Sequence, residues 1–209
     1  MTRATRWAYA LLMLMALYGC ATDPLPDYRF YHPAAGAEIK AIPAPLLREA
    51  LQVDPLRADG LYGERPIAYS LADEPQKVSQ YHYQLWTDPP GALFQRRMID
   101  ALQQYGIASL VTNRASPRAE PAKLTGVIER LERVRDAGVG QFRVVVVLRL
   151  RLDQHRGSVP MLQQRYEESR AAGGESISDS VNAMGAAVDA ITARFVTDLR
   201  ALPPAAAAR

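Results

Sequence analysis

One residue, Cys20, combines reactive chemistry with an informative position in the chain. It is the only cysteine among 209 residues, and it follows two basic residues, Arg3 and Arg6, and an apolar run from Trp7 to Leu17. This order is typical of a secretory signal, and the run is shorter than the roughly 20 residues that a membrane-spanning helix needs. An exported chain with one cysteine cannot close an internal disulfide, which leaves lipidation, an intermolecular bridge or a chance thiol.

The position of the cysteine favours lipidation. Leu17-Tyr18-Gly19-Cys20 resembles a bacterial lipobox, although the position of Tyr18 usually holds a small or β-branched residue. The resemblance implies cleavage after residue 19 and a Cys20 that carries a diacylglyceryl thioether and a further acyl chain such as palmitate. Each buried CH₂ group contributes about 0.8 kcal/mol, so several acyl chains anchor the protein stably to a membrane.

The residue after the cysteine indicates which membrane holds the anchor. Lipoproteins of Gram-negative bacteria that stay in the inner membrane usually have Asp at this position, whereas this chain has Ala21. The resemblance therefore implies delivery to the outer membrane, with the domain facing the periplasm.

The formal net charge is +3, and Arg and Lys are interleaved with Asp and Glu. Nucleic-acid binding requires a concentrated basic face, so we expect no nucleic-acid partner.

The other residues that could do chemistry form no recognisable motif. His32, His82 and His155 lie far apart in sequence, without the spacing typical of zinc sites. The chain has no G-x-S-x-G nucleophile elbow. Gly138-Val-Gly140 joins two predicted strands and lacks the lysine of a phosphate-binding loop. We therefore expect no metal, no cofactor and no catalytic site, and the chain is not predicted to be an enzyme.

An aromatic segment is the remaining candidate for a functional surface. Tyr81, Tyr83 and Trp86 lie close together in one predicted strand. Aromatic side chains with a polar tip are common at protein interfaces and at the level of lipid headgroups, so these residues could contact a partner or a membrane. Alternating aromatics also fill ordinary strands, and packing in the core is the other interpretation.

Alternating apolar residues predict the strands that would hold these side chains. The clearest strand is 141–153, in which apolar residues at even positions from Phe142 to Leu152 share one face and Arg alternates with Val on the other. Pro75 would mark a turn between two strands, and 33–45 is predicted to be a loop. The predicted strands are 28–31, 46–53, 63–70, 76–86, 108–112, 124–135, 141–153 and 158–168.

Two helices are predicted from apolar residues that repeat every three or four positions. The first covers 90–105 and would end at Gly106. The second covers 178–202, with Ser178 as its N-cap, and would be about 37 Å long, enough to cross a whole sheet. Arg96 and Arg97 lie partly off the first apolar stripe, where we expect a solvated helix face rather than an anion site.

These elements predict an α+β fold in a single domain. Its core would be a mostly antiparallel twisted sheet with two helices packed on one face. The domain would span 28–202, after a signal peptide at 1–19 and a lipidated tether at 20–27. The Ala-rich segment 203–209 is predicted to be disordered.

Four motifs between Tyr28 and Leu202 follow a familiar order. They are Arg65-Pro-Ile-Ala-Tyr69, a tyrosine-rich strand that ends at Trp86 before Pro89-Pro90, the helix before Gly106, and Leu124-Thr-Gly126. Together with the lipobox, this order resembles that of the ABC-type transport auxiliary lipoproteins of the PqiC and YmbA type.

The resemblance implies a non-catalytic subunit of a lipid-trafficking system that supports membrane integrity. Its partners would be an inner-membrane ABC permease or an MCE-domain protein that bridges the envelope, with phospholipid as a candidate cargo. Self-association into a homo-oligomeric ring stays open. The alternatives are a structural lipoprotein of envelope assembly that handles no lipid, and an enzyme on the periplasmic face.

Replacement of the cysteine tests the predicted anchor. Cys20→Ala should move the protein out of the membrane fraction, because acylation requires the thiol. The far-ultraviolet circular dichroism should stay unchanged, since Cys20 precedes the predicted fold. Fractionation of the envelope with immunodetection measures the effect, and a Cys20→Ala protein that stays with the membrane would contradict the lipoprotein interpretation.

Overall fold

The longest strand, β7 (Ala122–Arg135), is the spine of the sheet. The computed structural model describes residues 26–114, 121–136, 141–154 and 159–203, and nine strands of this part form one curled sheet. One edge of β7 pairs antiparallel with β8 (Phe142–Asp153) along almost its whole length. The other edge takes three short parallel partners in succession, which are β2 (Leu51–Val53), β3 (Arg57–Ala58) and β4 (Pro66–Leu71).

The outer strands extend the sheet on both sides of this spine. β9 (Leu162–Ala171) pairs antiparallel with β8, and β5 (Glu74–Trp86) pairs antiparallel with β4. Among the described strands, the antiparallel ladders are the long ones, while each parallel ladder has only two or three residue pairs. The predicted α+β fold in one domain is therefore confirmed. The remaining elements are β1 (Arg29–Tyr31) parallel to β5, β6 (Val111–Thr112) parallel to β2, and a short 3₁₀ helix, η1 (Gly60–Gly63).

The two faces of β8 differ as the sequence predicts. Even positions from Val144 to Leu152 are fully buried in the main core. On the opposite face, Val145 and Val147 form a small second cluster with Val134, while the arginines further along the strand are exposed. Other apolar side chains must therefore pack against the face of the sheet that carries the even positions of β8.

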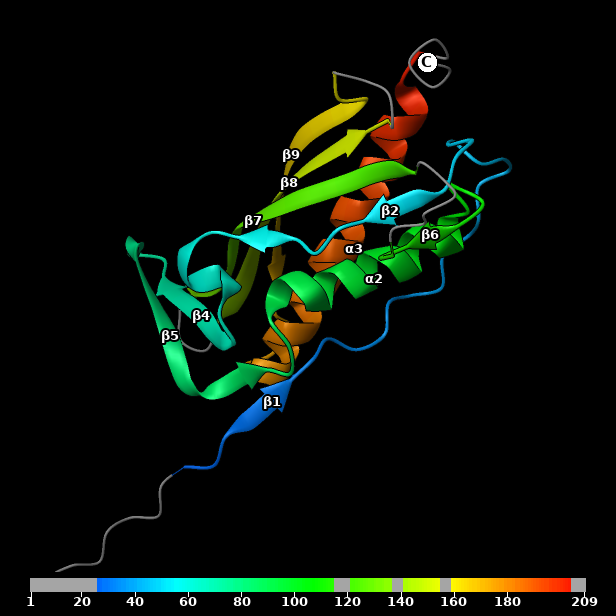
Figure 1. The fold of residues 1–209 in the computed structure, drawn as a ribbon. Helices are drawn as coiled ribbons and strands as arrows, with labels where there is room; N and C mark the ends of the chain where they lie inside the picture. The colour runs from blue at the N-terminus through cyan, green and yellow to red at the C-terminus, as the bar shows by residue number, and fades with distance from the viewer. Residues whose placement is uncertain (1–25, 115–120, 137–140, 155–158, 204–209) are drawn as a thin grey trace, which may run out of the picture.

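Two helices supply these side chains. α3 (Ile177–Ala201) lies against β8 and β9, and α2 (Pro90–Tyr105) lies beside α3 on the same side of the sheet (Figure 1). α2 has the predicted bounds, and Gly106 ends it with a φ of 71°, a left-handed conformation that glycine adopts without strain. The fully buried side chains of the two helices include Phe94, Met98, Leu102, Met184, Val188, Ile191 and Phe195.

The start of α3 differs from the prediction, because Ser176 and not Ser178 is the N-cap. The Asp179 backbone N–H donates to the Ser176 hydroxyl oxygen at 3.0 Å, and the Ser176 N–H donates to the Asp179 carboxylate at 3.1 Å. This reciprocal capping box needs an acidic or amide residue three positions after the cap. Ser176 has Asp179 there, whereas Ser178 has Val181.

Several strand boundaries also differ from the prediction. The turn before β5 lies at Ala72–Asp73, so the prediction that Pro75 marks the turn is wrong. Pro75 lies in the first part of β5, which pairs only with β4 among the described strands. Proline has no backbone N–H to donate to a neighbouring strand, so it is tolerated in an edge strand, where one side needs no such hydrogen bond. β2 and β6 are shorter than predicted, and β9 begins at Leu162. Gly138-Val-Gly140 and the Cys20 segment lie outside the described residues.

The capping box yields a test with a matched control. Ser176→Ala should lower the free energy of unfolding by about 1 kcal/mol, because two reciprocal hydrogen bonds at the helix start are lost. Ser178→Ala, two residues further along, should change it by less than about 0.5 kcal/mol. Urea unfolding of the purified mature protein measures both, and an equal loss for the two variants would contradict the assignment of the cap.

Candidate functional site

The structure separates the three aromatic residues that the sequence groups together. Trp86 is only 1% exposed and packs edge-on against Phe94, with ring centroids 5.8 Å apart. Trp86 is therefore a core residue and takes no part in a surface, which agrees with the core interpretation of this segment. Tyr81 and Tyr83 are half-buried, and their role in binding a partner stays a prediction.

Arg65 closes the strand pair that ends at Trp86. Its Nε donates to the carbonyl of Trp86 at 3.1 Å, and an Nη donates to the carbonyl of Thr87 at 3.2 Å. The Trp86 N–H in turn donates to the Arg65 carbonyl at 2.7 Å. The arginine-proline motif therefore fixes the beginning of β4 to the end of β5.

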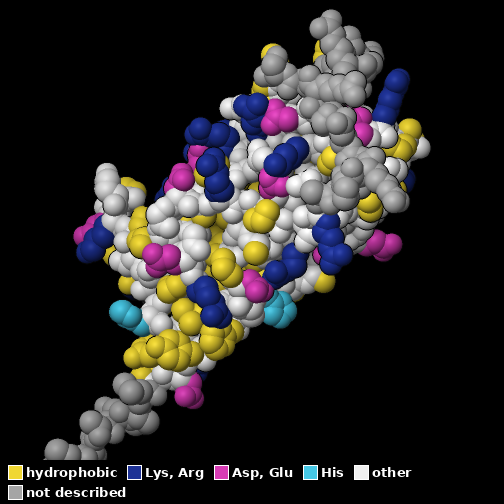
Figure 2. All heavy atoms as spheres, in the orientation of Figure 1, with side chains coloured by type: hydrophobic (Ala, Val, Ile, Leu, Met, Phe, Trp, Pro, Cys, Tyr) yellow, Lys and Arg dark blue, Asp and Glu magenta, His cyan; other side chains and the backbone are white. Residues whose placement is uncertain are grey.

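An exposed group of aromatic side chains, which sequence analysis did not single out as a surface, lies at β1 and the neighbouring part of β5. Tyr28 and Phe30 are 62% and 53% exposed, the Tyr28 ring lies 5.4 Å from that of Tyr83, and the Arg65 guanidinium lies 5.2 Å from the Phe30 ring centroid. Hydrophobic side chains gather at this end of the molecule, where β1 enters the fold (Figures 1 and 2). We call Tyr28, Phe30 and Tyr83 the aromatic edge.

After β1, residues 32–47 form a strap that runs along α2 to β2 (Figure 1). The backbone N–H of Ile42 donates to the carbonyl of Tyr105 at 2.9 Å, and the N–H of Leu46 donates to the carbonyl of Ile107 at 2.9 Å. The strap thus has no regular secondary structure, as predicted for 33–45, and yet it is hydrogen-bonded to the end of α2.

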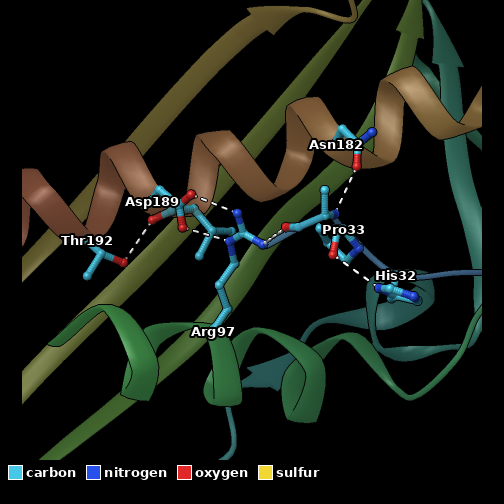
Figure 3. Close-up of polar contacts among 8 residues, drawn as sticks. His32, Pro33, Arg97, Asn182, Asp189 and Thr192 are labelled. Atoms are coloured by element: carbon cyan, nitrogen blue, oxygen red, sulfur yellow. Dashed lines mark hydrogen bonds and ion pairs between the residues drawn. The ribbon is translucent and has the colours of Figure 1, made fainter. Parts of the chain in front are cut away.

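Arg97 clamps the strap to both helices (Figure 3). Its Nε and one Nη donate to the two carboxylate oxygens of Asp189 on α3, each at 2.7 Å, and the other Nη donates to the carbonyl of Ala34 at 2.7 Å. The Ala34 N–H donates to the amide oxygen of Asn182 on α3 at 2.9 Å. One guanidinium therefore connects α2, α3 and the strap.

The two neighbouring arginines of α2 have different roles. The Arg96 side chain is 50% exposed and pairs with Asp88, so the predicted solvated face is correct there. The Arg97 side chain is 15% exposed, and the same prediction is wrong for it. The sequence could not reveal the clamp, because the partner carboxylate lies 92 positions away.

A glycine makes room for the strap on α3. A Cβ at Gly185 would lie 2.6 Å from the Pro33 Cβ and 3.1 Å from the Arg97 guanidinium carbon. Any other residue would therefore force the strap and the clamp away from the helix. An open cavity of about 490 Å³ lies next to this crossing, with lining residues that include Leu93, Phe94 and Arg96.

A second polar cluster, centred on Glu132, joins β7 to β4 and η1. The buried Glu132 carboxylate accepts hydrogen bonds from the Tyr62 hydroxyl at 3.0 Å, Ser70 Oγ at 3.1 Å and Arg130 Nε at 2.6 Å. Burial, and then the nearby charge of Glu132, raise the pKa of Tyr62 to about 12. Tyr62 stays protonated at neutral pH and donates its hydrogen bond, so this cluster acts as a structural link.

The described residues offer no site for metal chemistry. No group of three His, Cys, Asp or Glu side chains in this part of the chain could hold a metal ion. His32 and His82 are exposed on different elements, and His155 lies outside the described residues. None of the described helices is long and apolar enough to cross a bilayer.

Comparisons with known proteins give a family and a fold. The model of a family described as "ABC-type transport auxiliary lipoprotein component" matches residues 34–196. The crystal structure of protein XCC0632 from Xanthomonas campestris is similar with a TM-score of 0.66 and 18% identity, covering 80% of this chain and 92% of that one. A crystal structure of an uncharacterized protein has a TM-score of 0.61 and 11% identity, covering 83% and 99%. No curated protein matches in sequence.

The clamp yields a prediction that compares two adjacent arginines. Arg97→Ala should lower the free energy of unfolding by about 2 kcal/mol or more, because it leaves a half-buried carboxylate and a strap carbonyl without their charged donor. Arg96→Ala should cost less than about 1 kcal/mol, since its ion pair is exposed. Urea unfolding gives the energies. Limited proteolysis should cut the strap faster in Arg97→Ala alone, and equal cleavage of both variants would contradict the clamp.

Proposed function

Because this chain belongs to the family of ABC-type transport auxiliary lipoprotein components, we propose that it is a non-catalytic docking subunit of an MCE/ABC-type lipid transport system. It is anchored in the outer membrane through Cys20 and faces the periplasm. The observation that carries this proposal is the family match over residues 34–196, which extends from the strap into α3. The lipobox-like residues that precede the match supply the anchor.

The route of the chain supports a domain held close to the membrane. Asp27, just before the aromatic edge, lies seven positions after Cys20, and an extended segment of this length spans at most about 25 Å. The anchor therefore keeps the aromatic edge near one leaflet, where Tyr and Phe side chains suit the headgroup level. Confinement to this layer raises the effective concentration of the domain for a partner, so weak contacts suffice.

The free edge of β5 supports docking by strand addition. Between Glu74 and Tyr83, β5 pairs with β4 on one side and with no other described strand. An unpaired edge presents backbone donors and acceptors to an extended segment of another chain. Inside the domain, the polar groups of the described residues form satisfied networks such as that of Glu132.

Capture of partners from envelopes tests the proposal. The mature acylated protein, used as bait in solubilised envelopes, should recover an MCE-domain protein or an ABC permease together with phospholipid. The Cys20→Ala protein serves as the control bait, and it should recover less of each because, without the anchor, it is not held at the outer membrane, where the partner system would reach it. Recovery of outer-membrane barrel components alone, without lipid, would contradict the transport role and favour envelope assembly.

The aromatic edge gives a separate prediction about the membrane. In the Cys20→Ala background, Phe30→Ser should weaken binding to vesicles of phosphatidylethanolamine and phosphatidylglycerol at least about tenfold, because a Phe side chain that enters the interface contributes about 1.5–3 kcal/mol. Val159→Ser removes another exposed apolar side chain, from the loop before β9, and should leave binding unchanged. Vesicle sedimentation measures both variants, and an equal effect would show that the aromatic edge does not face the membrane.

A further inference from the structure

A second cavity, of about 290 Å³, opens on the helix-covered side of the sheet near the start of α3. Its lining includes two arginines of β7, Arg133 and Arg135, and we call it the arginine pocket. The strand register places Tyr69 opposite Arg133 and Phe142 opposite Arg135. Directly paired residues point to the same face of a sheet, so these side chains share one face. Tyr81 completes the group, with its ring 4.5 Å from that of Tyr69.

Arg133 is a buried cation whose recorded partners are all uncharged. It is 6% exposed, its Nε donates to Ser180 Oγ at 2.9 Å, and one Nη donates to the Tyr81 hydroxyl at 2.7 Å. The other Nη donates to the backbone carbonyl of Glu175. The guanidinium carbon also lies 3.4 Å from the centroid of the Phe142 ring.

Three carboxylates on neighbouring segments bond to groups other than Arg133. Glu132, its neighbour in β7, pairs with Arg130, and Asp136 pairs with Arg143. Asp179 caps α3. Within the described part of the chain, no carboxylate oxygen lies within 4 Å of Arg133 or Arg135. Arg97 and Arg130 are less buried than Arg133, with side chains 15% and 33% exposed, and each of them has an acidic partner.

This arrangement leaves a positive charge without its counter-ion. Burial of a cation is costly unless an opposite charge or full hydrogen bonding compensates it. A guanidinium has five N–H donors, and the three recorded bonds leave two of them available. The start of α3 adds its positive dipole end beside Glu175. Arg135 is exposed and adds a second cation at the same cavity.

We infer that the arginine pocket binds a phosphate group. A planar guanidinium suits the tetrahedral oxygens of a phosphate in a bidentate manner, and the hydroxyl groups of Tyr69 and Tyr81 can donate to the same oxygens. The cavity has room for several non-hydrogen atoms beyond the phosphate, since one water molecule takes about 30 Å³ in the liquid. The ligand is a phosphate monoester or diester, which a lipid headgroup or a free phosphate compound can both supply. This inference does not rest on the proposed docking function.

Calorimetric titration of the full-length mature protein in uncharged detergent tests the arginine pocket. The probes are inorganic phosphate, glycerol 3-phosphate and dihexanoyl phosphatidylglycerol, each against a chloride buffer of equal ionic strength. We expect saturable binding of at least one probe. A preference of about tenfold or more for the lipid would identify a headgroup site, and equal or tighter binding of the other two would identify a site for soluble phosphate compounds. The absence of saturable binding for all three probes overturns the inference.

Three variants assign the binding to this pocket. Arg135→Gln removes an exposed cation without a recorded structural bond and should weaken binding at least fivefold, whereas Arg48→Gln, an equal loss of charge at an exposed strap-adjacent position, should not. Arg133→Lys keeps the charge but loses the planar guanidinium that can bind a phosphate through two N–H groups, and it should weaken binding about tenfold. Thermal unfolding verifies that the first two variants remain folded, so the test survives if Arg133→Lys does not fold. Equal affinity of Arg135→Gln and Arg48→Gln overturns the inference.

Discussion

The burial of α3 against the β7–β8–β9 ladder is the interaction on which the rest of the structure depends. The ladder presents one continuous apolar face, and the buried stripe of α3 from Val181 to Leu199 covers it. Each large apolar side chain that is fully buried contributes about 1.5–3 kcal/mol, so this contact outweighs any single polar bond in the domain. α2 packs beside α3, and the strap is clamped across both helices. The position of the N-terminal chain is thus fixed by a helix at the opposite end of the sequence.

Sequence analysis predicted best those elements whose bounds follow from the periodicity of their own apolar residues. α2, β7 and β8 are long and strongly periodic, and their observed bounds lie within two residues of the predicted ones. The strands β2, β3 and β6 have two or three residues each and exist because β7 or β2 offers them an edge, so no local pattern could define their limits. The N-cap of α3 was misplaced by two residues because two serines compete, and only the position of Asp179 decides between them.

The candidate site was less predictable than the fold because its parts come from distant segments. Tyr28 meets Tyr83 through the parallel pairing of β1 with β5, and Arg97 meets Asp189 through the packing of two helices. Composition and spacing contain no signal for either contact. Trp86 is the opposite case: a residue of a type common at interfaces is buried in the core, where its ring packs against that of Phe94. The lipobox-like residues, by contrast, are contiguous, and the chemistry they imply can be inferred directly from the sequence.

The aromatic edge and the arginine pocket lie close together, because Tyr83 of the first and Tyr81 of the second are two positions apart in β5. In the proposed function, the aromatic edge and the tether would hold this end at a membrane, and the arginine pocket opens next to it, near the start of α3. The strap links β1 to both helices through Arg97.

The distribution of phospholipid between the two membranes tests the central claim most directly. Pulse-labelled phospholipid would be followed in inner and outer membranes of cells that contain or lack the protein. A role in lipid transport predicts an altered rate of exchange without the protein, restored by the wild type and not by the unanchored Cys20→Ala form. An unchanged rate of exchange in cells that lack the protein would contradict this role.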